Sequence, residues 1–283
     1  MKELLRIDHL TKIYRPPARS IFHKRRAVHA VDDVSFSLYE GESLGLVGES
    51  GSGKTTIAKM IMGLVKPTAG EIHYEDTNLL TLKGQARKEM KKKIQIVFQD
   101  PYSSLNPKKT IGWSLGEALD IHRVGTKEER REAVENLLLE VGLPGAYSTH
   151  FPSELSGGQR QRVAIAQALI LRPEIVIIDE GVSALDVSIQ ASILNLLKEL
   201  QAKYNLTYIF ISHDLNVIEY FCDRVAVLYR GKLVELFRPE EYMSTPHDPY
   251  TEKLFRAAMD PLDKRSAKKE NEKEKKKDKG NEQ

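Results

Sequence analysis

Runs of apolar residues along the chain alternate with longer, helically spaced segments. Continuous or alternating apolar positions predict strands at residues 4–14, 31–39, 44–47, 94–98, 175–178 and 207–211. Apolar residues at helical spacing predict helices at residues 55–64, 115–122, 127–141, 156–171 and 188–204. Strands that alternate with helices in this order predict an α/β fold with a mostly parallel sheet.

Three other segments complete the predicted organisation. Residues 224–229 and 232–237 flank Arg230-Gly231 and predict an antiparallel hairpin. Between residues 100 and 152 the strands give way to helical spacing, which indicates a helical subdomain over about 100–172. Residues 15–26 carry two prolines and many basic residues and predict a loop.

Composition and charge narrow the class of protein. The chain has 283 residues and a formal net charge of +3. Residues 263–283 hold 9 of the 43 Lys and Arg and 6 of the 40 Asp and Glu, so the rest of the chain is neutral. Nucleic-acid-binding domains more often have a basic body, so we expect no nucleic acid as partner. The Lys/Glu-rich residues 263–283 contain almost nothing apolar and predict a disordered charged tail.

Hydrophobicity and cysteine content argue against a membrane-spanning chain and against a secreted chain with internal disulfides. The sequence contains no apolar run of 18 residues, so no transmembrane helix is expected. Its first residues include Glu3 and Asp8 without a long apolar core, and they do not resemble a signal peptide. We therefore expect a cytosolic chain. The single cysteine, Cys222, cannot form an internal disulfide, and we expect it to be buried.

A glycine-rich loop lies between the predicted strand 44–47 and the predicted helix 55–64. Its sequence, GESGSGKT at residues 48–55, matches the phosphate-binding pattern G-x-x-x-x-G-K-[ST]. Glycines let backbone N–H groups turn toward an anion, Lys54 supplies a positive charge, and Thr55 offers a hydroxyl to Mg²⁺. The expected nucleotide-binding residues here are Gly48, Glu49, Ser50, Gly51, Ser52, Gly53, Lys54, Thr55 and Thr56.

Two carboxylates end the buried strand 175–178. Ligands of open α/β sheets bind at the carboxyl ends of the strands. We expect Asp179 to hold Mg²⁺ and Glu180 to act as general base toward the attacking water. The loop and the acids together predict an enzyme that hydrolyses a nucleoside triphosphate with Mg²⁺.

The sequence LSGGQ at residues 155–159 resembles the signature of the ABC ATPase family. The resemblance covers about residues 4–240 and implies an ABC ATPase domain over 1–240 with a P-loop core, an antiparallel β region and the helical subdomain. It also implies roles for single residues. Gln99 is the glutamine that contacts Mg²⁺ and the reacting phosphate, His213 the switch histidine, and Tyr14 the aromatic stacked on adenine. Asp186 is a nucleotide-binding residue at the end of the loop 183–186.

The signature also has a physical reading as a second anion site. Ser156, Gly157, Gly158 and Gln159 stand where a helix begins, and free N–H groups at a helix start bind anions. One chain with two phosphate cradles suggests that each nucleotide is shared between two chains. The family resemblance implies the same head-to-tail dimer, with either a sister subunit or a second copy.

Further segments resemble the ATPase subunits of oligopeptide and dipeptide importers. They are VFQDPYSSLNP at 97–107, DEGVSALDVSIQ at 179–190 and TPHDPYTEKL at 245–254, the last within an importer-type extension over 241–262. With one cysteine, the chain resembles the member of the ATPase pair that lacks a cysteine cluster. This resemblance implies two membrane permease subunits, contacted through residues 100–152, and an extracytoplasmic solute-binding protein. It places the chain at the cytoplasmic face of the membrane.

Three alternatives remain open from the sequence. Importers of nickel or sugars share the same ATP site, and the transported solute is not written in this chain. An ABC ATPase that acts on DNA or ribosomes is disfavoured by the neutral body and the lack of coiled-coil or zinc segments. A regulatory module without turnover is disfavoured because Lys54, Asp179, Glu180 and His213 are all present.

The single tryptophan, Trp113, is expected to pack in the helical subdomain rather than to form part of a ligand site.

Overall fold

The computed structural model describes residues 2–15, 27–98, 100, 105–181, 186–242, 244–245 and 247–259. The predicted loop at 15–26 and the predicted disordered tail at 263–283 therefore lie, except for Arg15, outside the described residues. The boundaries of the domain, the extension and the tail stay predictions.

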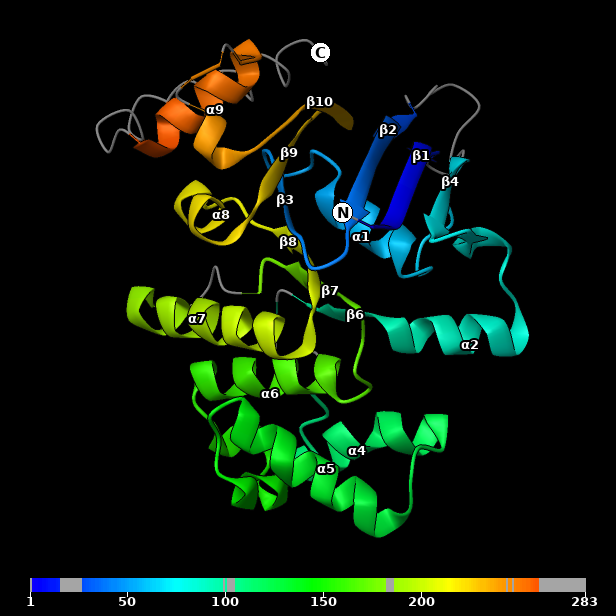
Figure 1. Ribbon diagram of the computed structural model, residues 1–283, viewed down its shortest axis with the longest axis vertical. Helices are drawn as coiled ribbons and strands as arrows, with labels where there is room; N and C mark the ends of the chain where they lie inside the picture. The colour runs from blue at the N-terminus through cyan, green and yellow to red at the C-terminus, as the bar shows by residue number, and fades with distance from the viewer. Residues whose placement is uncertain are drawn as a thin grey trace, which may run out of the picture.

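A six-stranded sheet forms the centre of the molecule (Figure 1). Its order is β10-β9-β3-β8-β7-β6, and only the β9–β10 pair is antiparallel. The strands are β3 (Ser43–Val47), β6 (Ile94–Val97), β7 (Ile175–Asp179), β8 (Thr207–Ile211), β9 (Arg224–Tyr229) and β10 (Lys232–Phe237). The mostly parallel α/β sheet and the hairpin predicted from the sequence are thus confirmed.

A second sheet of four antiparallel strands packs beside the first. Its order is β2-β1-β4-β5. The strands are β1 (Glu3–Tyr14), β2 (Val28–Tyr39), β4 (Ala69–Tyr74) and β5 (Thr77–Asn78). The sequence predicted β1 and β2 but not the short β4 and β5.

Eight α-helices lie in the described part of the chain. They are α1 (Lys54–Ile61), α2 (Gly84–Lys93), α4 (Ile111–His122), α5 (Lys127–Glu140), α6 (Gly157–Leu169), α7 (Val187–Tyr204), α8 (Leu215–Phe221) and α9 (Pro249–Met259). Short 3₁₀ turns occur at Leu79–Thr81, Gly145–Thr149, Pro152–Glu154 and Pro239–Glu241. None of these helices is both long enough and apolar enough to cross a membrane.

The central strands β3, β7 and β8 are buried at every position, because most of their residues are apolar and both faces of the sheet are covered. Along β8, Ile209 and Ile211 point into the core shared with the antiparallel sheet and α1, whereas Tyr208 and Phe210 point into the core shared with α7 and α8. All four are fully buried. Successive strand side chains point to opposite faces, so one strand supports both cores. Cys222 is buried in the second core, as predicted.

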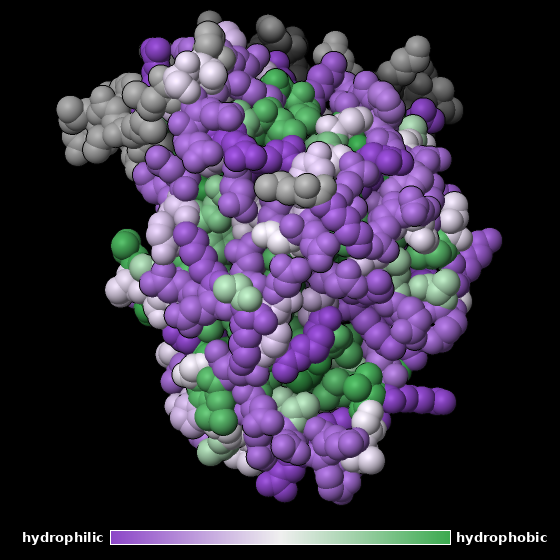
Figure 2. Space-filling view, viewed as in Figure 1, coloured by the Kyte–Doolittle hydropathy of each residue, from purple (hydrophilic) through white to green (hydrophobic). Residues whose placement is uncertain are grey.

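Helices α4, α5 and α6 form the lower part of the molecule in Figure 1. Their starts are fixed by capping side chains, among them Thr126 and Glu129, which form a capping box at α5. Hydrophobic residues gather on this part of the surface in Figure 2. Trp113 is 41% exposed there, so the expectation that it packs inside the subdomain was wrong. The Lys109 ammonium lies 4.7 Å from the centre of its ring.

Candidate ATP site

The carboxyl ends of three neighbouring parallel strands bring the predicted site residues together. In the register of the sheet, Leu46 of β3 pairs with Ile211 of β8, and Ile211 pairs with Asp179 of β7. The loop 48–53 follows β3, Glu180 follows β7 and His213 follows β8. Three segments far apart in the sequence therefore meet at one sheet edge, where α/β folds bind their ligands.

The phosphate loop depends on glycine at two of its positions. Gly48 has φ 142° and Gly53 φ 110°. A Cβ at Gly48 would lie 2.1 Å from the Leu228 carbonyl oxygen, and one at Gly53 would lie 2.4 Å from the Ala30 carbonyl oxygen. Backbone groups cannot move out of the way as a side chain can, so both positions require glycine. The N–H of Gly231 in the β9–β10 turn donates to the Ser52 carbonyl oxygen at 3.1 Å and supports the loop from behind.

Lys54 opens α1 and folds back over its own loop. Its ammonium donates to the carbonyl oxygens of Gly48 at 2.7 Å and Glu49 at 2.9 Å. The residue is only 5% exposed. Burial lowers the pKa of Lys54, and the charges of Glu180 and Asp179 oppose that shift. The loop thus holds a desolvated cation at its centre, where phosphate oxygens are able to replace the carbonyl partners.

Asp179 and Thr55 place two oxygen ligands side by side. The Thr55 hydroxyl donates to Asp179 Oδ1 at 3.0 Å, and Asp179 is 5% exposed. Burial raises the pKa of the Asp179 carboxyl, partly offset by the hydrogen bond from Thr55. Mg²⁺ prefers oxygen ligands and commonly takes one or two from carboxylates and the rest from phosphates and water. The pair therefore fits a magnesium ion that arrives with a nucleotide.

Glu180 and His213 face each other across the ends of β7 and β8. His213 Nδ1 lies 3.8 Å from Glu180 Oε1, and the side chains are 62% and 23% exposed, respectively. Glu180 has φ 51°, a left-handed conformation that is uncommon for a residue with a side chain. Its N–H donates to the Ile211 carbonyl oxygen at 2.9 Å, which ties this conformation to the neighbouring strand. Unusual backbone conformations are often found at functional sites.

Tyr14 lies at the end of β1 and is 43% exposed. The ammonium of Lys12 lies 5.0 Å from the centre of its ring. An exposed aromatic ring is free to stack on a base, which is compatible with the adenine contact that the family resemblance implies.

The signature residues lie on the helical subdomain. Ser156 caps α6: its hydroxyl accepts the N–H of Gln159 at 3.4 Å, and Gln159 Oε1 accepts the N–H of Ser156 at 2.8 Å. A Cβ at Gly158 would lie 2.8 Å from Ile189 Cγ2, so α6 and α7 approach closely there. Figure 1 shows α6, whose N-cap and first turn the signature residues form, well below α1, which follows the phosphate loop.

Two predicted site residues, Gln99 and Asp186, lie in or next to segments that the structure does not describe. Gln99 lies outside the described residues, as do residues 183–185 of the loop before α7. Asp186 is described: it precedes α7, and its carbonyl oxygen accepts the N–H of Gln190 at 2.8 Å. The roles of Gln99 and Asp186 stay predictions.

One contact to the phosphate loop was not predicted from the sequence. The N–H of Glu49 donates to the hydroxyl oxygen of Tyr250 at 3.1 Å, across 201 positions of sequence. Tyr250 belongs to α9, and no periodicity within the chain links it to residue 49. The motif resemblance at residues 245–254 marked the segment but gave no contact for it.

Comparison with known proteins places the chain in a family. The sequence profile of the ABC transporter family matches residues 31–183, more than half of the chain. This chain therefore belongs to the ABC transporter family, and it is an ATP-binding cassette of that family. The resemblance seen in the signature and phosphate-loop residues is confirmed.

Three relatives are similar over most of the chain. The oligopeptide transport ATP-binding proteins AppF and OppF of Bacillus subtilis (strain 168) are 49% and 47% identical over 86% and 90% of this chain, and over 75% and 82% of their own lengths. The dipeptide transport ATP-binding protein DppF of Escherichia coli (strain K12) is 45% identical over 93% of this chain and 79% of its own length. The predicted resemblance to importer ATPases of this kind is confirmed.

Solved structures confirm the fold. The ATP-binding cassette MJ0796, in a dimeric post-hydrolysis state bound to ADP and Pi, is 31% identical and has a TM-score of 0.73, over 83% of this chain and 99% of that one. The structure of cbiO1 from Clostridium perfringens has a TM-score of 0.74 at 24% identity, over 93% of this chain and 97% of that one. The predicted P-loop ATPase fold is thus confirmed.

Proposed function

We propose that this chain hydrolyses ATP to energise the import of oligopeptides or dipeptides. The observation that carries the proposal is its identity of 45–49% to three transport ATP-binding proteins named for these solutes. Those matches span 246 to 264 residues of this chain. Identity at this level over most of both chains favours the same kind of transporter over importers of nickel or sugars.

The site geometry supports a division of roles at the nucleotide. Lys54 and the loop 48–56 would bind the phosphates, and Tyr14 would stack on adenine. Thr55 and Asp179 would hold Mg²⁺, which neutralises phosphate charge when it is bound. Glu180 would accept a proton from the attacking water, while His213, 3.8 Å away, would contact the reacting phosphate. Gln99 would contact Mg²⁺ and the reacting phosphate.

A second chain would complete the site. Ser156 to Gln159 lie apart from the phosphate loop of their own chain, and in the related cassette MJ0796 the structure is dimeric. We therefore expect the start of α6 to face the nucleotide held by a sister subunit or a second copy. ATP would then stabilise the closed dimer because it contacts both chains.

The proposed membrane partners are two permease subunits, with an extracytoplasmic solute-binding protein on the other side. Exposed apolar side chains on the helical subdomain support a docking surface there. They are Trp113, Ile121, Val124, Leu139 and Phe151. This arrangement would hold the chain at the cytoplasmic face of the membrane.

Uptake of labelled peptides tests the proposed solute. Cells that lack this chain should lose uptake of di- to pentapeptides, and the wild-type chain should restore it whereas Glu180→Gln should not. If peptide uptake is equal with and without the chain, and uptake of nickel or a sugar is lost instead, the proposed solute is wrong. The assignment of the chain to an importer would still stand.

Capture of partners tests the assembly. Tagged Glu180→Gln protein, purified from detergent-solubilised membranes with Mg-ATP, should bring down two permeases and a sister ATPase. Recovery of ribosomal or DNA-repair proteins without a permease would contradict the transport proposal.

A further inference from the structure

The C-terminal helix α9 reaches the phosphate loop through one side chain. Tyr250 accepts the N–H of Glu49 at 3.1 Å on its hydroxyl oxygen. Its ring packs on Tyr229 at the end of β9, with ring centroids 4.1 Å apart. Burial raises the pKa of Tyr250 to about 12, so the hydroxyl stays protonated. The contact is therefore a neutral hydrogen bond held in place by an aromatic pair.

The peptide groups around Glu49 connect this contact to the phosphate-binding cation. The N–H of Glu49 is held by Tyr250, and the carbonyl oxygen of the same residue accepts from the Lys54 ammonium at 2.9 Å. The Glu49 carbonyl also accepts the N–H of Ser52 at 3.1 Å. Glu49 thus lies between the C-terminal extension and the group that binds the β- and γ-phosphates.

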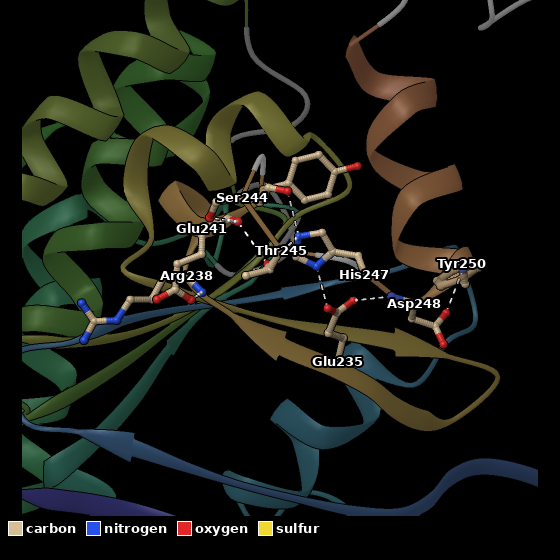
Figure 3. A network of polar contacts seen from close by, with 9 residues as sticks. Glu235, Arg238, Glu241, Ser244, Thr245, His247, Asp248 and Tyr250 are labelled. Atoms are coloured by element: carbon tan, nitrogen blue, oxygen red, sulfur yellow. Dashed lines mark hydrogen bonds and ion pairs between the residues drawn. The ribbon is translucent and has the colours of Figure 1, made fainter.

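The segment before α9 is fixed to strand β10 by a network of polar contacts (Figure 3). Glu235 Oε1 lies 2.6 Å from His247 Nδ1, and Glu235 Oε2 accepts the N–H of Asp248 at 3.2 Å. Burial raises the pKa of the Glu235 carboxyl, but hydrogen bonds from neighbours including His247 and Asp248 outweigh it and leave that pKa below its usual range. Asp248 Oδ1 then accepts the N–H of Tyr250 at 2.8 Å.

Aromatic packing also holds the segment before α9 against β10. The His247 side chain is only 3% exposed, and its Nε2 lies 2.9 Å from the Tyr242 carbonyl oxygen. Its ring stacks on Tyr242 at 4.6 Å and packs against Phe237 of β10 at 4.7 Å. Phe255 of α9 packs on Tyr242 from farther along the extension, with centroids 4.5 Å apart. These packed side chains hold the segment that leads into α9, and they thereby fix the position of Tyr250.

We propose that Tyr250 is a positioning residue for the phosphate loop, and that the C-terminal extension controls nucleotide affinity through it. The extension supplies a fixed hydroxyl, anchored to β10, that holds the Glu49 peptide in the conformation from which Lys54 reaches phosphate. Coupling between two sites is reciprocal, so bound nucleotide must in turn stabilise the docking of α9. This inference rests on the proposed assignment of residues 48–56 as the phosphate loop.

The test compares nucleotide binding by the full chain in three variants, Tyr250→Phe, Tyr242→Phe and Lys54→Ala. Tyr250→Phe keeps the Tyr229 packing and removes only the hydroxyl, and we expect Mg-ATP to bind about two- to tenfold more weakly, the effect of one neutral hydrogen bond. Tyr242→Phe removes a hydroxyl from the same extension and should bind Mg-ATP as the wild type does. The melting temperature without nucleotide, measured for each variant, separates lost affinity from lost folding.

Three outcomes would overturn the inference. They are unchanged affinity in Tyr250→Phe, equal loss of affinity in Tyr242→Phe, or a loss that is explained by a lower melting temperature. Lys54→Ala distinguishes this failure from failure of the site. If Lys54→Ala also binds as the wild type does, the phosphate loop itself is wrongly assigned. If Lys54→Ala loses binding and Tyr250→Phe does not, only the role of Tyr250 is wrong.

Amide hydrogen exchange provides a second readout that needs no change of affinity. Mg-ATP should slow exchange in residues 249–259 of the wild type and slow it less in Tyr250→Phe. Exchange in α9 that is identical with and without nucleotide would contradict the reciprocal coupling.

Discussion

Glu180 and His213 lie 3.8 Å apart at the ends of two adjacent parallel strands, and both emerge from fully buried apolar segments. The sheet therefore fixes their separation, since neither strand can slide without moving a row of buried side chains to the opposite face. A carboxylate and an imidazole at this spacing, beside the phosphate loop, are suited to proton transfer and to contact with a phosphate.

Removing the proposed base tests this pair most directly. Glu180→Gln keeps the size of the side chain but cannot accept a proton, so ATP hydrolysis should fall by about 10² to 10⁴. Binding of Mg-ATP should persist because Lys54 and the loop are intact. Single-turnover hydrolysis and equilibrium binding measure the two effects separately. Hydrolysis near the wild-type rate would mean that another group acts as base.

The histidine should act on the same step. In His213→Ala, hydrolysis at saturating ATP should fall by about 10² to 10³, the usual effect of losing one group that stabilises developing charge. In the double variant with Glu180→Gln the two losses should not add, because residues that act as a unit lose their effect together. Full additivity of the two rate losses would show that the residues act independently.

The buried carboxylate Asp179 predicts a trade between stability and activity. Burial raises its pKa, so the charged form is disfavoured in the folded chain. Asp179→Asn can still accept the Thr55 hydroxyl and removes the buried charge. We expect a higher melting temperature without nucleotide, by about 2–4 °C for each kcal/mol gained, and loss of Mg-dependent hydrolysis.

The pH dependence of that gain has a definite sign. At a pH below the ordinary pKa of aspartate, Asp179 is neutral in both folded and unfolded chains, and Asp179→Asn should melt as the wild type does. As the pH rises from that ordinary pKa to the raised folded-state pKa, the unfolded chain loses its proton before the folded chain does. The wild type therefore loses stability over this interval, and the advantage of the variant grows until the folded residue has also ionised. An advantage that is largest in acid, measured by thermal unfolding at several pH values, would contradict the burial argument.

Two glycines of the phosphate loop, Gly48 and Gly51, should differ in how far an alanine substitution weakens nucleotide binding. Gly48→Ala places a Cβ 2.1 Å from a backbone oxygen, so the loop must move and nucleotide binding should be lost. Gly51 has φ 83° with nothing within 4 Å of its Cβ position. Gly51→Ala therefore has only the left-handed backbone to accommodate, at about 1–2 kcal/mol. Comparable binding in the two variants would show that the Leu228 contact is not limiting.

The sequence predicted the strands of the parallel sheet because each is a short, mostly apolar run, and it predicted α5, α6 and α7 because their apolar residues repeat at helical spacing. It missed α2, whose residues 84–93 include only Met90 as a large apolar side chain and bury none. It missed β4 because only Ile72 and Tyr74 of that strand are buried. In such segments tertiary contacts, rather than local pattern, decide the conformation.

The site shows the same division. Lys54, Asp179, Glu180 and His213 could be found because each belongs to a motif next to a strong apolar strand, and parallel strands bring their carboxyl ends to one edge. The contact between Tyr250 and Glu49 could not be found, because it depends on how far a terminal helix folds back over the sheet. A hydrogen bond across 201 positions leaves no trace in spacing or composition.

The position of β10 gives the extension another consequence. This strand is an outer member of the six-stranded sheet, and Phe237 at its end is buried against Tyr242, His247 and Phe255. A chain cleaved after Phe237 would present that aromatic ring to solvent on an outer strand, a combination that promotes association between sheets. A protease cut between β10 and α9 should therefore promote aggregation of the remaining chain.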